Sequence, residues 1–170
     1  MARGRVWKFG DNIATDLITP NTLITMSFPE MAKQVLKLVR PDFAPNVKPG
    51  DILVAGTNFG CSSGRTFAPK ALKYTGIGAI VVESVSRTFY RNAHELGIGF
   101  VVCPGITEVV DDGDEMEVDT NTGKITDITK GITLQGKVED GLLKDMIDNG
   151  GLIPLLESEA GEKYRKLLEE

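Results

Sequence analysis

The sequence predicts an α/β fold in which a parallel β-α-β-α-β core carries a small antiparallel meander. Three apolar runs, at residues 51–55, 79–83 and 100–103, show little polar alternation, which is typical of strands buried on both faces. Helical segments of about one crossover length separate them, so we expect parallel strands with right-handed connections. Residues 114–135 instead alternate polar and apolar side chains between turn signals, which predicts antiparallel strands.

Shorter elements are expected before this core. Residues 5–9 have the apolar character of a short strand, and Gly10 begins a turn. Residues 13–26 have no helical period and contain a proline, so we expect a loop with short extended pieces. Residues 27–30, Ser-Phe-Pro-Glu, resemble a capping box. They predict a helix that ends before Pro41 and buries an apolar stripe. That stripe consists of Met31, Ala32, Val35, Leu36 and Val39.

Helices are predicted within the core and after the meander. The core helices span about residues 65–74 and 87–96, the second closed by a glycine. A late helix around residues 142–147 stops at Gly150, and residues 157–170 form a charged C-terminal helix or tail. No linker, internal repeat or low-complexity tract interrupts the chain. Residues 1–170 are therefore predicted to form a single domain, a size that buries about two-thirds of the unfolded surface.

Composition excludes several classes of function. The net charge is −5 without a basic cluster, which argues against nucleic-acid and anionic-membrane binding. Apolar runs are too short to cross a membrane, so we expect a soluble cytoplasmic protein. One histidine (His94) and two cysteines (Cys61 and Cys103) cannot ligate an iron–sulfur cluster or a zinc ion of the usual spacing. Any metal chemistry therefore requires ligands from another chain.

The loop at residues 58–65, Asn-Phe-Gly-Cys-Ser-Ser-Gly-Arg, is the strongest candidate site. It follows a predicted parallel strand and precedes a helix, which is where open α/β sheets bind ligands. Amides at a helix start favour an anion, and Arg65 can hold a carboxylate through two parallel hydrogen bonds. A tight structural turn would have the same composition. The Gly-Lys-Ser/Thr ending of a phosphate-binding P-loop is missing.

This loop resembles the Asn-Phe-Gly-Cys-Gly-Ser-Ser-Arg signature of the aconitase-superfamily swivel domain, a swivelling β/β/α fold. Other segments extend the resemblance, in particular to the small subunits of 3-isopropylmalate dehydratases. Residues 9–16 are similar to the family's opening Asp-x-x-x-Thr-Asp, residues 89–93 to its Phe-Tyr-Arg-Asn-Ala and residues 150–152 to its Gly-Gly-Leu. The resemblance covers about residues 4–156.

The resemblance implies a leucine-biosynthesis hydro-lyase made of two subunits that act on a small hydroxy-dicarboxylic acid. A large subunit carries a [4Fe–4S] cluster, and this chain itself binds no cofactor. The family's catalytic serine falls on Ser63 and its carboxylate-binding arginine on Arg65. Ser62 and Gly64 exchange the residue types of the family's Gly-Ser-Ser-Arg, so they are included among the substrate-binding candidates. Ser62 stays open as an alternative to Ser63.

A second family landmark is a substrate-selecting loop, onto which residues Thr22, Leu23, Ile24 and Thr25 align. Isopropylmalate enzymes resemble Tyr-Leu-Val-Tyr here, and homoaconitase-like subunits place an arginine at the third position. Ile24 offers no partner for a distal carboxylate, which argues against homoaconitate and suits an alkyl substituent. The small subunit of a 2,3-dimethylmalate dehydratase is therefore the nearest alternative, and homoaconitase a more distant one. Alternatively, Leu23 and Ile24 are ordinary core residues with no part in substrate selection.

Two functions of other classes stay open from the residues alone. One is a self-contained hydrolase with Ser63 or Cys61 as nucleophile and His94 as base, although no Gly-x-Ser-x-Gly elbow is present. The other is a non-catalytic binding module. An isolated swivel subunit also exposes the surface meant for its partner, so self-association is an alternative to a monomer.

Overall fold

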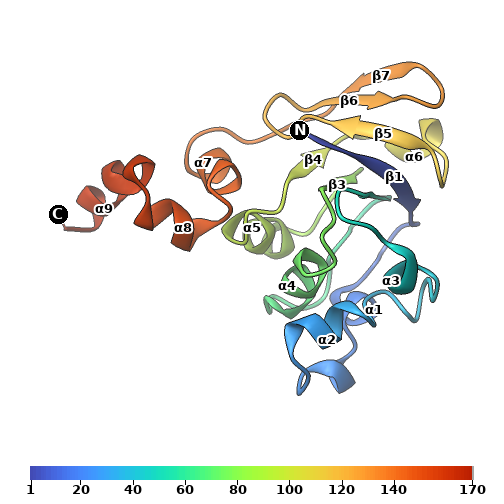
Figure 1. Cartoon of the computed structure of the whole chain (residues 1–170), viewed down its shortest axis with the longest axis horizontal. Helices are drawn as coiled ribbons and strands as arrows, with labels where there is room; N and C mark the ends of the chain where they lie inside the picture. Colours follow the sequence, from blue (N-terminus) through green and yellow to red (C-terminus); the bar gives the residue numbers. More distant parts are fainter. Residues whose placement is uncertain (170) are drawn as a thin grey trace.

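The computed structural model describes residues 1–169, which contain a seven-stranded mixed sheet flanked by helices (Figure 1). The strands are β1 (Ala2–Lys8), β2 (Ile52–Ala55), β3 (Ala79–Val82), β4 (Phe100–Val102), β5 (Glu115–Val118), β6 (Lys124–Asp127) and β7 (Ile132–Gln135). Their order is β4-β3-β2-β1-β5-β6-β7, with a parallel half from β4 to β1 and an antiparallel half from β1 to β7. The predicted α/β class, parallel core and meander are confirmed.

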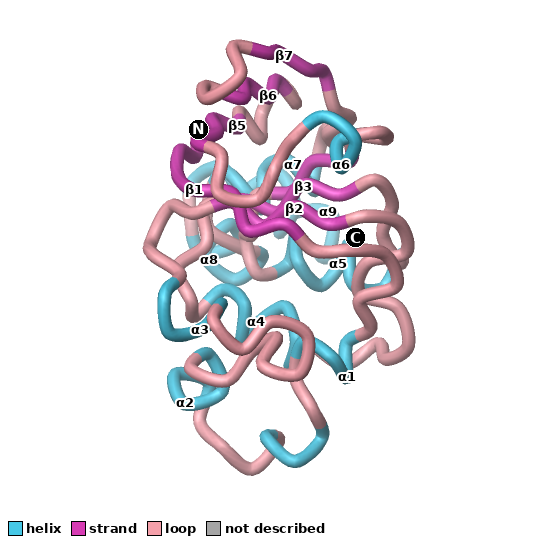
Figure 2. The backbone as a smooth tube through the Cα atoms, turned by 90° about the vertical axis from the view of Figure 1, so that its right-hand side faces the viewer, coloured by secondary structure: helices cyan, strands magenta, loops and turns pink. Residues whose placement is uncertain are grey.

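Short helices connect and cover the sheet. The α-helices are α1 (Thr15–Ile18), α2 (Phe28–Ala32), α3 (Phe43–Asn46), α4 (Phe67–Lys73), α5 (Arg87–Glu95), α6 (Ile106–Val109), α7 (Leu142–Asp148), α8 (Leu152–Glu157) and α9 (Glu162–Glu169). Two 3₁₀ helices, η1 (Asn21–Leu23) and η2 (Glu159–Gly161), lie among them. Figure 2 shows β5, β6 and β7 at one end of the molecule and α1 to α4 at the other. Within the described residues, no helix is long and apolar enough to span a membrane.

Strand β1 joins the two halves of the sheet because it divides its length between two partners. Its first four residues pair antiparallel with β5, with Ala2 opposite Val118. Its last three pair parallel with β2, with Val6 opposite Ile52. The sequence predicted a strand at residues 5–9 but did not indicate this double pairing. The consequence is that the N-terminal strand is central in the sheet, and the segment after it crosses the carboxyl end of β2.

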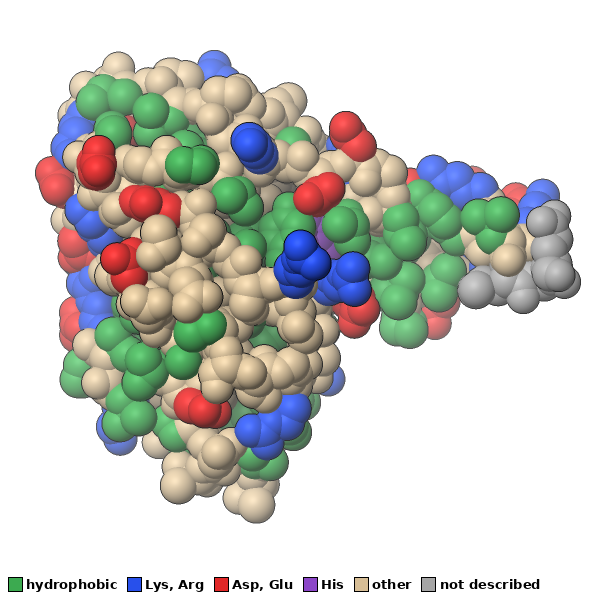
Figure 3. Space-filling model, turned by 180° about the vertical axis from the view of Figure 1, so that it is seen from behind, with side chains coloured by type: hydrophobic (Ala, Val, Ile, Leu, Met, Phe, Trp, Pro, Cys, Tyr) green, Lys and Arg blue, Asp and Glu red, His purple; other side chains and the backbone are tan. Residues whose placement is uncertain are grey.

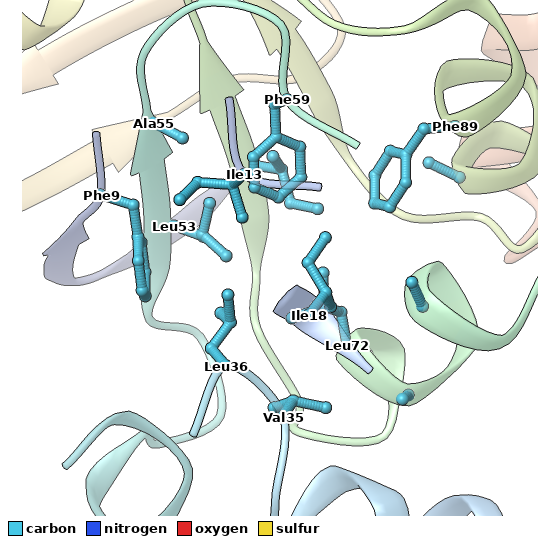
Figure 4. Close-up of a cluster of buried hydrophobic side chains, with 14 of the residues drawn as sticks. Phe9, Ile13, Ile18, Val35, Leu36, Leu53, Ala55, Phe59, Leu72 and Phe89 are labelled. Atoms are coloured by element: carbon cyan, nitrogen blue, oxygen red, sulfur yellow. The ribbon is translucent and has the colours of Figure 1, made fainter. Parts of the chain in front are cut away.

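Alternate residues of the parallel strands fill two hydrophobic clusters on opposite faces. Leu53 and Ala55 of β2 pack into the larger cluster with α1, α4 and α5, which Figure 4 shows in close-up. Ile52 and Val54 pack into the smaller cluster with α6 and the meander. All four are fully buried. Burial of each of the three larger side chains, Ile52, Leu53 and Val54, is worth about 1.5–3 kcal/mol, so the carboxyl end of β2 is a rigid base for the loop that follows.

The helix predicted from the capping box is shorter than expected. The capping box is present, with Ser27 and Glu30 bonded to each other, but α2 ends at Ala32 and turns fill residues 33–39. The backbone of Leu36 has a left-handed φ of 59°, which no α-helix contains. Its side chain is fully buried, and its N–H donates to the Ile18 carbonyl at 2.9 Å. This long-range hydrogen bond replaces the bond that Leu36 would make within a helix, and it fixes α1. Val39, which was predicted to lie on the buried stripe, is 39% exposed.

The C-terminal helices form an arm that leaves the body of the molecule beside α5 (Figure 1). Helices α7 and α8 contact α5, and α9 contacts α8 and η2. Apolar side chains gather along this arm in the view from behind (Figure 3), and Ile153 is 64% exposed. Of residues 157–170, predicted as a charged helix or tail, Glu162–Glu169 form α9, whereas Glu157 ends α8 and Glu159–Gly161 form η2; residue 170 lies outside the described residues.

One buried carboxylate makes the stability of the meander depend on pH. Asp127 is 1% exposed, and its Oδ2 atom has no hydrogen-bond partner among the described residues. Burial, and then the nearby Asp114 carboxylate, raise the pKa of Asp127 above its ordinary value. The folded state therefore holds this proton more tightly than the unfolded state does. Stability is lost as the pH rises from the unfolded pKa through the folded one.

Asp127→Asn removes this charge and is expected to raise the melting temperature at pH 7 by about 2–4 °C. At pH 4 the gain should be smaller, because wild-type Asp127 is then more protonated. Asp119→Asn is the matched control of opposite sign, since hydrogen bonds from Thr122 and Asn121 lower the pKa of Asp119. Thermal unfolding across pH 4–8 measures both. A destabilised Asp127→Asn variant at pH 7 would show that the Asp127 charge is compensated.

Candidate functional site

The loop between β2 and α4 has an unusual backbone. Asn58, Gly60 and Ser62 have positive φ values of 58°, 68° and 88°. A β-carbon on Gly60 would lie 2.2 Å from the Phe89 ring, so glycine is required there. Ser62, in contrast, occupies a left-handed position, which costs a residue with a side chain about 1–2 kcal/mol. The loop is therefore strained at the residue immediately before Ser63.

The glycine at position 64 lies close to α5. In this chain Gly64 faces Thr88 of α5, and a β-carbon added at Gly64 would lie 3.0 Å from the Thr88 methyl group. A serine at position 64 would require Thr88 to move. The Gly64 carbonyl also accepts a 3.0 Å hydrogen bond from the side-chain amide of Asn92. Relative to Gly-Ser-Ser-Arg, this chain therefore has its glycine at the position that α5 approaches, and a serine at the position with the strained backbone.

Two segments hold this loop from opposite sides. On one side the Gly60 N–H donates to the Ile13 carbonyl at 2.8 Å, and the Thr15 N–H donates to the Cys61 carbonyl at 2.9 Å. On the other side the Ser86 hydroxyl, which caps α5, donates to the Gly60 carbonyl at 2.6 Å. These three hydrogen bonds tie the loop to both segments. The segment 13–15 and the start of α5 therefore determine where the Ser63 side chain lies.

Ser63, Arg65 and Asn21 form a connected polar cluster. The Ser63 hydroxyl oxygen accepts from Arg65 Nε at 3.1 Å and from the Arg65 backbone N–H at 3.3 Å. Arg65 Nη2 donates to Asn21 Oδ1 at 2.7 Å. The Ser63 N–H in turn donates to the Thr15 hydroxyl oxygen at 3.1 Å. A guanidinium and a backbone amide pointing at one serine oxygen favour its negatively charged form.

This cluster lies in a small, half-open pocket, which we call the Ser63 pocket. Polar and apolar side chains from two segments make its walls. They are Thr15, Asp16, Thr19, Asn21, Ile24, Ser63, Arg65, Phe67 and Ala68. The donors of this pocket outnumber its single carboxylate, Asp16, so it is suited to bind an oxyanion beside an apolar surface.

The structure brings three of the residues singled out from the sequence into this pocket, namely Ser63, Arg65 and Ile24. Ser62 and Gly64 belong to the same loop but not to the pocket wall, and both are exposed. Of the remaining three, Leu23 is buried in the core, whereas Thr22 and Thr25 are exposed outside the wall.

Two polar wall residues, Thr19 and Asn21, were not singled out from the sequence, whereas Thr15 and Asp16 end the motif at residues 9–16. The motif at residues 9–16 pointed to their neighbourhood. Nothing in the local pattern indicated that this segment packs on the Ser63 loop.

His94 does not take part in this pocket. It is fully buried in α5, and its Nδ1 atom bonds to the Tyr90 carbonyl at 2.8 Å. Burial lowers the pKa of His94, which favours the neutral ring. A histidine base beside Ser63 or Cys61, as a self-contained hydrolase requires, is therefore not available from His94. Among the described residues, no three His, Cys, Asp or Glu side chains gather into a metal site.

Comparison with known proteins assigns this fold and loop to one group. Residues 18–100 match the family described as the aconitase C-terminal domain. The isopropylmalate/citramalate isomerase small subunit of Methanocaldococcus jannaschii is 44% identical over 161 residues, covering 94% of this chain and 96% of that protein. The 3-isopropylmalate dehydratase small subunit of Methanosarcina mazei is also 44% identical and covers 99% of both chains.

A solved structure agrees with these sequences. The crystal structure of a 3-isopropylmalate dehydratase chain from Methanocaldococcus jannaschii superposes with a TM-score of 0.87 at 36% identity, covering 99% of this chain and 96% of that one. Small subunits named for other substrates are similar at comparable levels. A methanogen homoaconitase of Methanothermobacter thermautotrophicus is 43% identical and a 2,3-dimethylmalate dehydratase of Eubacterium barkeri 40%.

Proposed function

This chain belongs to the aconitase C-terminal domain family, as the small subunit of a hydro-lyase, and on that premise we propose that it is one half of a 3-isopropylmalate dehydratase. The observation that carries the proposal is the contact between the Ser63 hydroxyl and the Arg65 guanidinium within the pocket. In this proposal Ser63 removes a proton from the substrate, and Arg65 holds a substrate carboxylate. A large subunit completes the active site.

Arg65 has the geometry for this binding role. Its guanidinium uses Nε on Ser63 and one Nη2 hydrogen on Asn21, so three of its five N–H groups have no partner among residues 1–169 and are available to a ligand. A carboxylate accepts two parallel hydrogen bonds from such a fork. The Asn21 side chain fixes the plane of the guanidinium because its oxygen accepts from Nη2 at 2.7 Å. Arg65 therefore orients the substrate relative to the serine oxygen it touches.

Ser63 has the surroundings of a base. Elimination of water requires that a C–H proton move to the Ser63 oxygen while the electron pair forms a C=C bond and the hydroxyl on the neighbouring carbon leaves. The same serine returns the proton in the reverse, hydrating direction. The Arg65 N–H groups stabilise the charged serine oxygen in the resting state. Isomerisation follows when water adds back with the opposite orientation.

The large subunit is proposed to hold a [4Fe–4S] cluster, because the residues of this chain do not fit one. Such clusters bind through cysteine thiolates, and this chain has only Cys61, which is half-buried, and Cys103, which is buried. When bound, the cluster would supply a Lewis acid for the departing hydroxyl. Neither subunit is expected to act alone.

The apolar part of the Ser63 pocket supports an alkyl-substituted malate as substrate. Ile24, Phe67 and Ala68 line it, and Arg65 is the only cation among the described lining residues. A second, distal carboxylate at this wall would be desolvated without a partner, which costs several kcal/mol. An isopropyl group loses nothing there. The same wall accepts methyl substituents, so 2,3-dimethylmalate is the alternative substrate.

Ile24→Arg is expected to reverse this selection. In the pair reconstituted with its large subunit, the variant should lose at least about 10-fold in kcat/KM for 3-isopropylmalate, because a cation replaces apolar contact. It should gain turnover of homoaconitate, whose distal carboxylate then has a partner. Ile24→Leu keeps the apolar wall and serves as the matched control. Assays of isopropylmalate, dimethylmalate and homoaconitate measure the ratios, and ratios that Ile24→Arg leaves unchanged would refute Ile24 as the selecting residue.

A further inference from the structure

We propose that Thr19 is a further substrate-binding residue, whose hydroxyl donates a hydrogen bond to the carboxylate that Arg65 holds. This inference rests on the proposed function and deepens it. Thr19 follows directly after α1 and lies in the wall of the Ser63 pocket. It is not part of the Asn58–Arg65 loop or of the aligned selecting loop at residues 22–25.

The hydroxyl of Thr19 has no partner in the described part of the chain. The residue is 7% exposed, and its Oγ1 atom is buried without a hydrogen bond. Its backbone N–H, in contrast, is bonded and donates to the Thr15 carbonyl at 2.8 Å. A buried hydroxyl that bonds to nothing destabilises a fold, and valine has nearly the same shape without that cost. The fold therefore gains nothing from the oxygen atom, which points to a ligand.

The other polar groups of the pocket differ from Thr19 in this respect. Thr15 accepts from the Ser63 N–H, so its hydroxyl has a structural use. Asn21 and Ser63 are each bonded to Arg65. Thr19 alone among these wall residues is buried and unbonded. The Thr19 hydroxyl therefore still has a hydrogen bond to offer to a ligand in the pocket.

The chemistry of the pocket indicates which ligand atom Thr19 meets. The hydroxyl can donate one hydrogen bond, and a carboxylate offers about four acceptor sites. Two of those sites suffice for the Arg65 fork, which leaves others for a neighbouring donor. Asp16, the carboxylate of the pocket wall, is exposed and makes no hydrogen bond with Thr19. We therefore assign the Thr19 donor to a substrate oxygen and not to this chain.

The test compares Thr19→Val with Thr19→Ser in the reconstituted two-subunit enzyme. Thr19→Val keeps the shape and removes the donor, so KM for 3-isopropylmalate should rise about 10- to 100-fold, the range for a hydrogen bond to a charged group. The value of kcat should stay within about 3-fold. Thr19→Ser should restore KM to within about 3-fold of wild type. Thr133→Val, at an exposed threonine of β7, is the matched control and should change neither constant.

Thermal unfolding of the isolated chain separates binding from structure. Removal of an unbonded buried hydroxyl should leave the melting temperature of Thr19→Val unchanged or raised, while KM worsens. A variant that is destabilised and not rescued by serine would mark Thr19 as structural and overturn the inference. An unchanged KM would do the same, and would assign the hydroxyl to an ordered water. If the wild-type pair dehydrates none of the three substrates, the proposed function fails first and the inference falls with it.

Discussion

Ser63→Ala, assayed in the reconstituted pair, is expected to lower kcat for 3-isopropylmalate about 10³-fold, within the range for general acid–base catalysis. KM should stay within a few-fold, because Arg65 and Asn21 keep their mutual hydrogen bond and still bind the carboxylate. The loss falls on kcat because the variant has no replacement base. Among the described wall residues, only the Ser63 oxygen accepts hydrogen bonds from two Arg65 donors.

Ser62→Ala is the control for this variant. Ser62 is exposed and lies outside the pocket wall. Its backbone φ is positive, and serine and alanine are similarly strained there. Its substitution should change kcat by less than about 3-fold. Steady-state kinetics with equal large-subunit occupancy distinguish the two positions. A large loss from Ser62→Ala, with a small one from Ser63→Ala, would move the base to Ser62.

Arg65→Lys is expected to lower kcat/KM at least about 100-fold although the charge is kept. One ammonium group cannot reproduce the flat fork that contacts Ser63, Asn21 and a carboxylate at once. Both constants should change, because the arginine binds the substrate and also stabilises the serine oxygen. This dual effect distinguishes Arg65 from Thr19, for which only KM is expected to move.

Arg3→Lys is the matched control for Arg65→Lys. Arg3 pairs with Glu115 and Glu117 on the exposed surface between β1 and β5, away from the pocket. The substitution should leave kcat/KM within about 2-fold of wild type, since exposed ion pairs contribute little. If Arg65→Lys behaves like Arg3→Lys, the guanidinium does not hold the substrate and the assignment of the carboxylate site is wrong.

The parallel half of the sheet could be predicted because its determinant is local. Strands buried on both faces need continuous apolar runs, and residues 52–55 and 79–82 carry them with both clusters in contact. The prediction of a helix that continues almost to Pro41 was wrong because its determinant is not local. A long-range hydrogen bond from Leu36 to Ile18, with a left-handed backbone, outweighed the local helical pattern.

The candidate site divides in the same way. Ser63 and Arg65 are adjacent in a motif, so their proximity is visible in the sequence. Thr19 and Asn21 reach the same pocket only because α1 and η1 pack on the loop more than 40 positions later, and Asn21 bonds across 44 residues to Arg65. The close approach of Thr88 to Gly64 is likewise a contact that no local pattern contains.

The requirement for a partner is the centre of this account, and one assay tests it directly. This chain and a cluster-bearing large subunit are produced together under anaerobic conditions and also apart. Dehydration of isopropylmalate, dimethylmalate and homoaconitate, and hydration of the corresponding alkenes, are then followed in each preparation. We expect turnover by the pair on an alkyl-substituted malate, with isopropylmalate preferred, and none by either chain alone. Turnover by the isolated chain on any of these substrates would contradict the account.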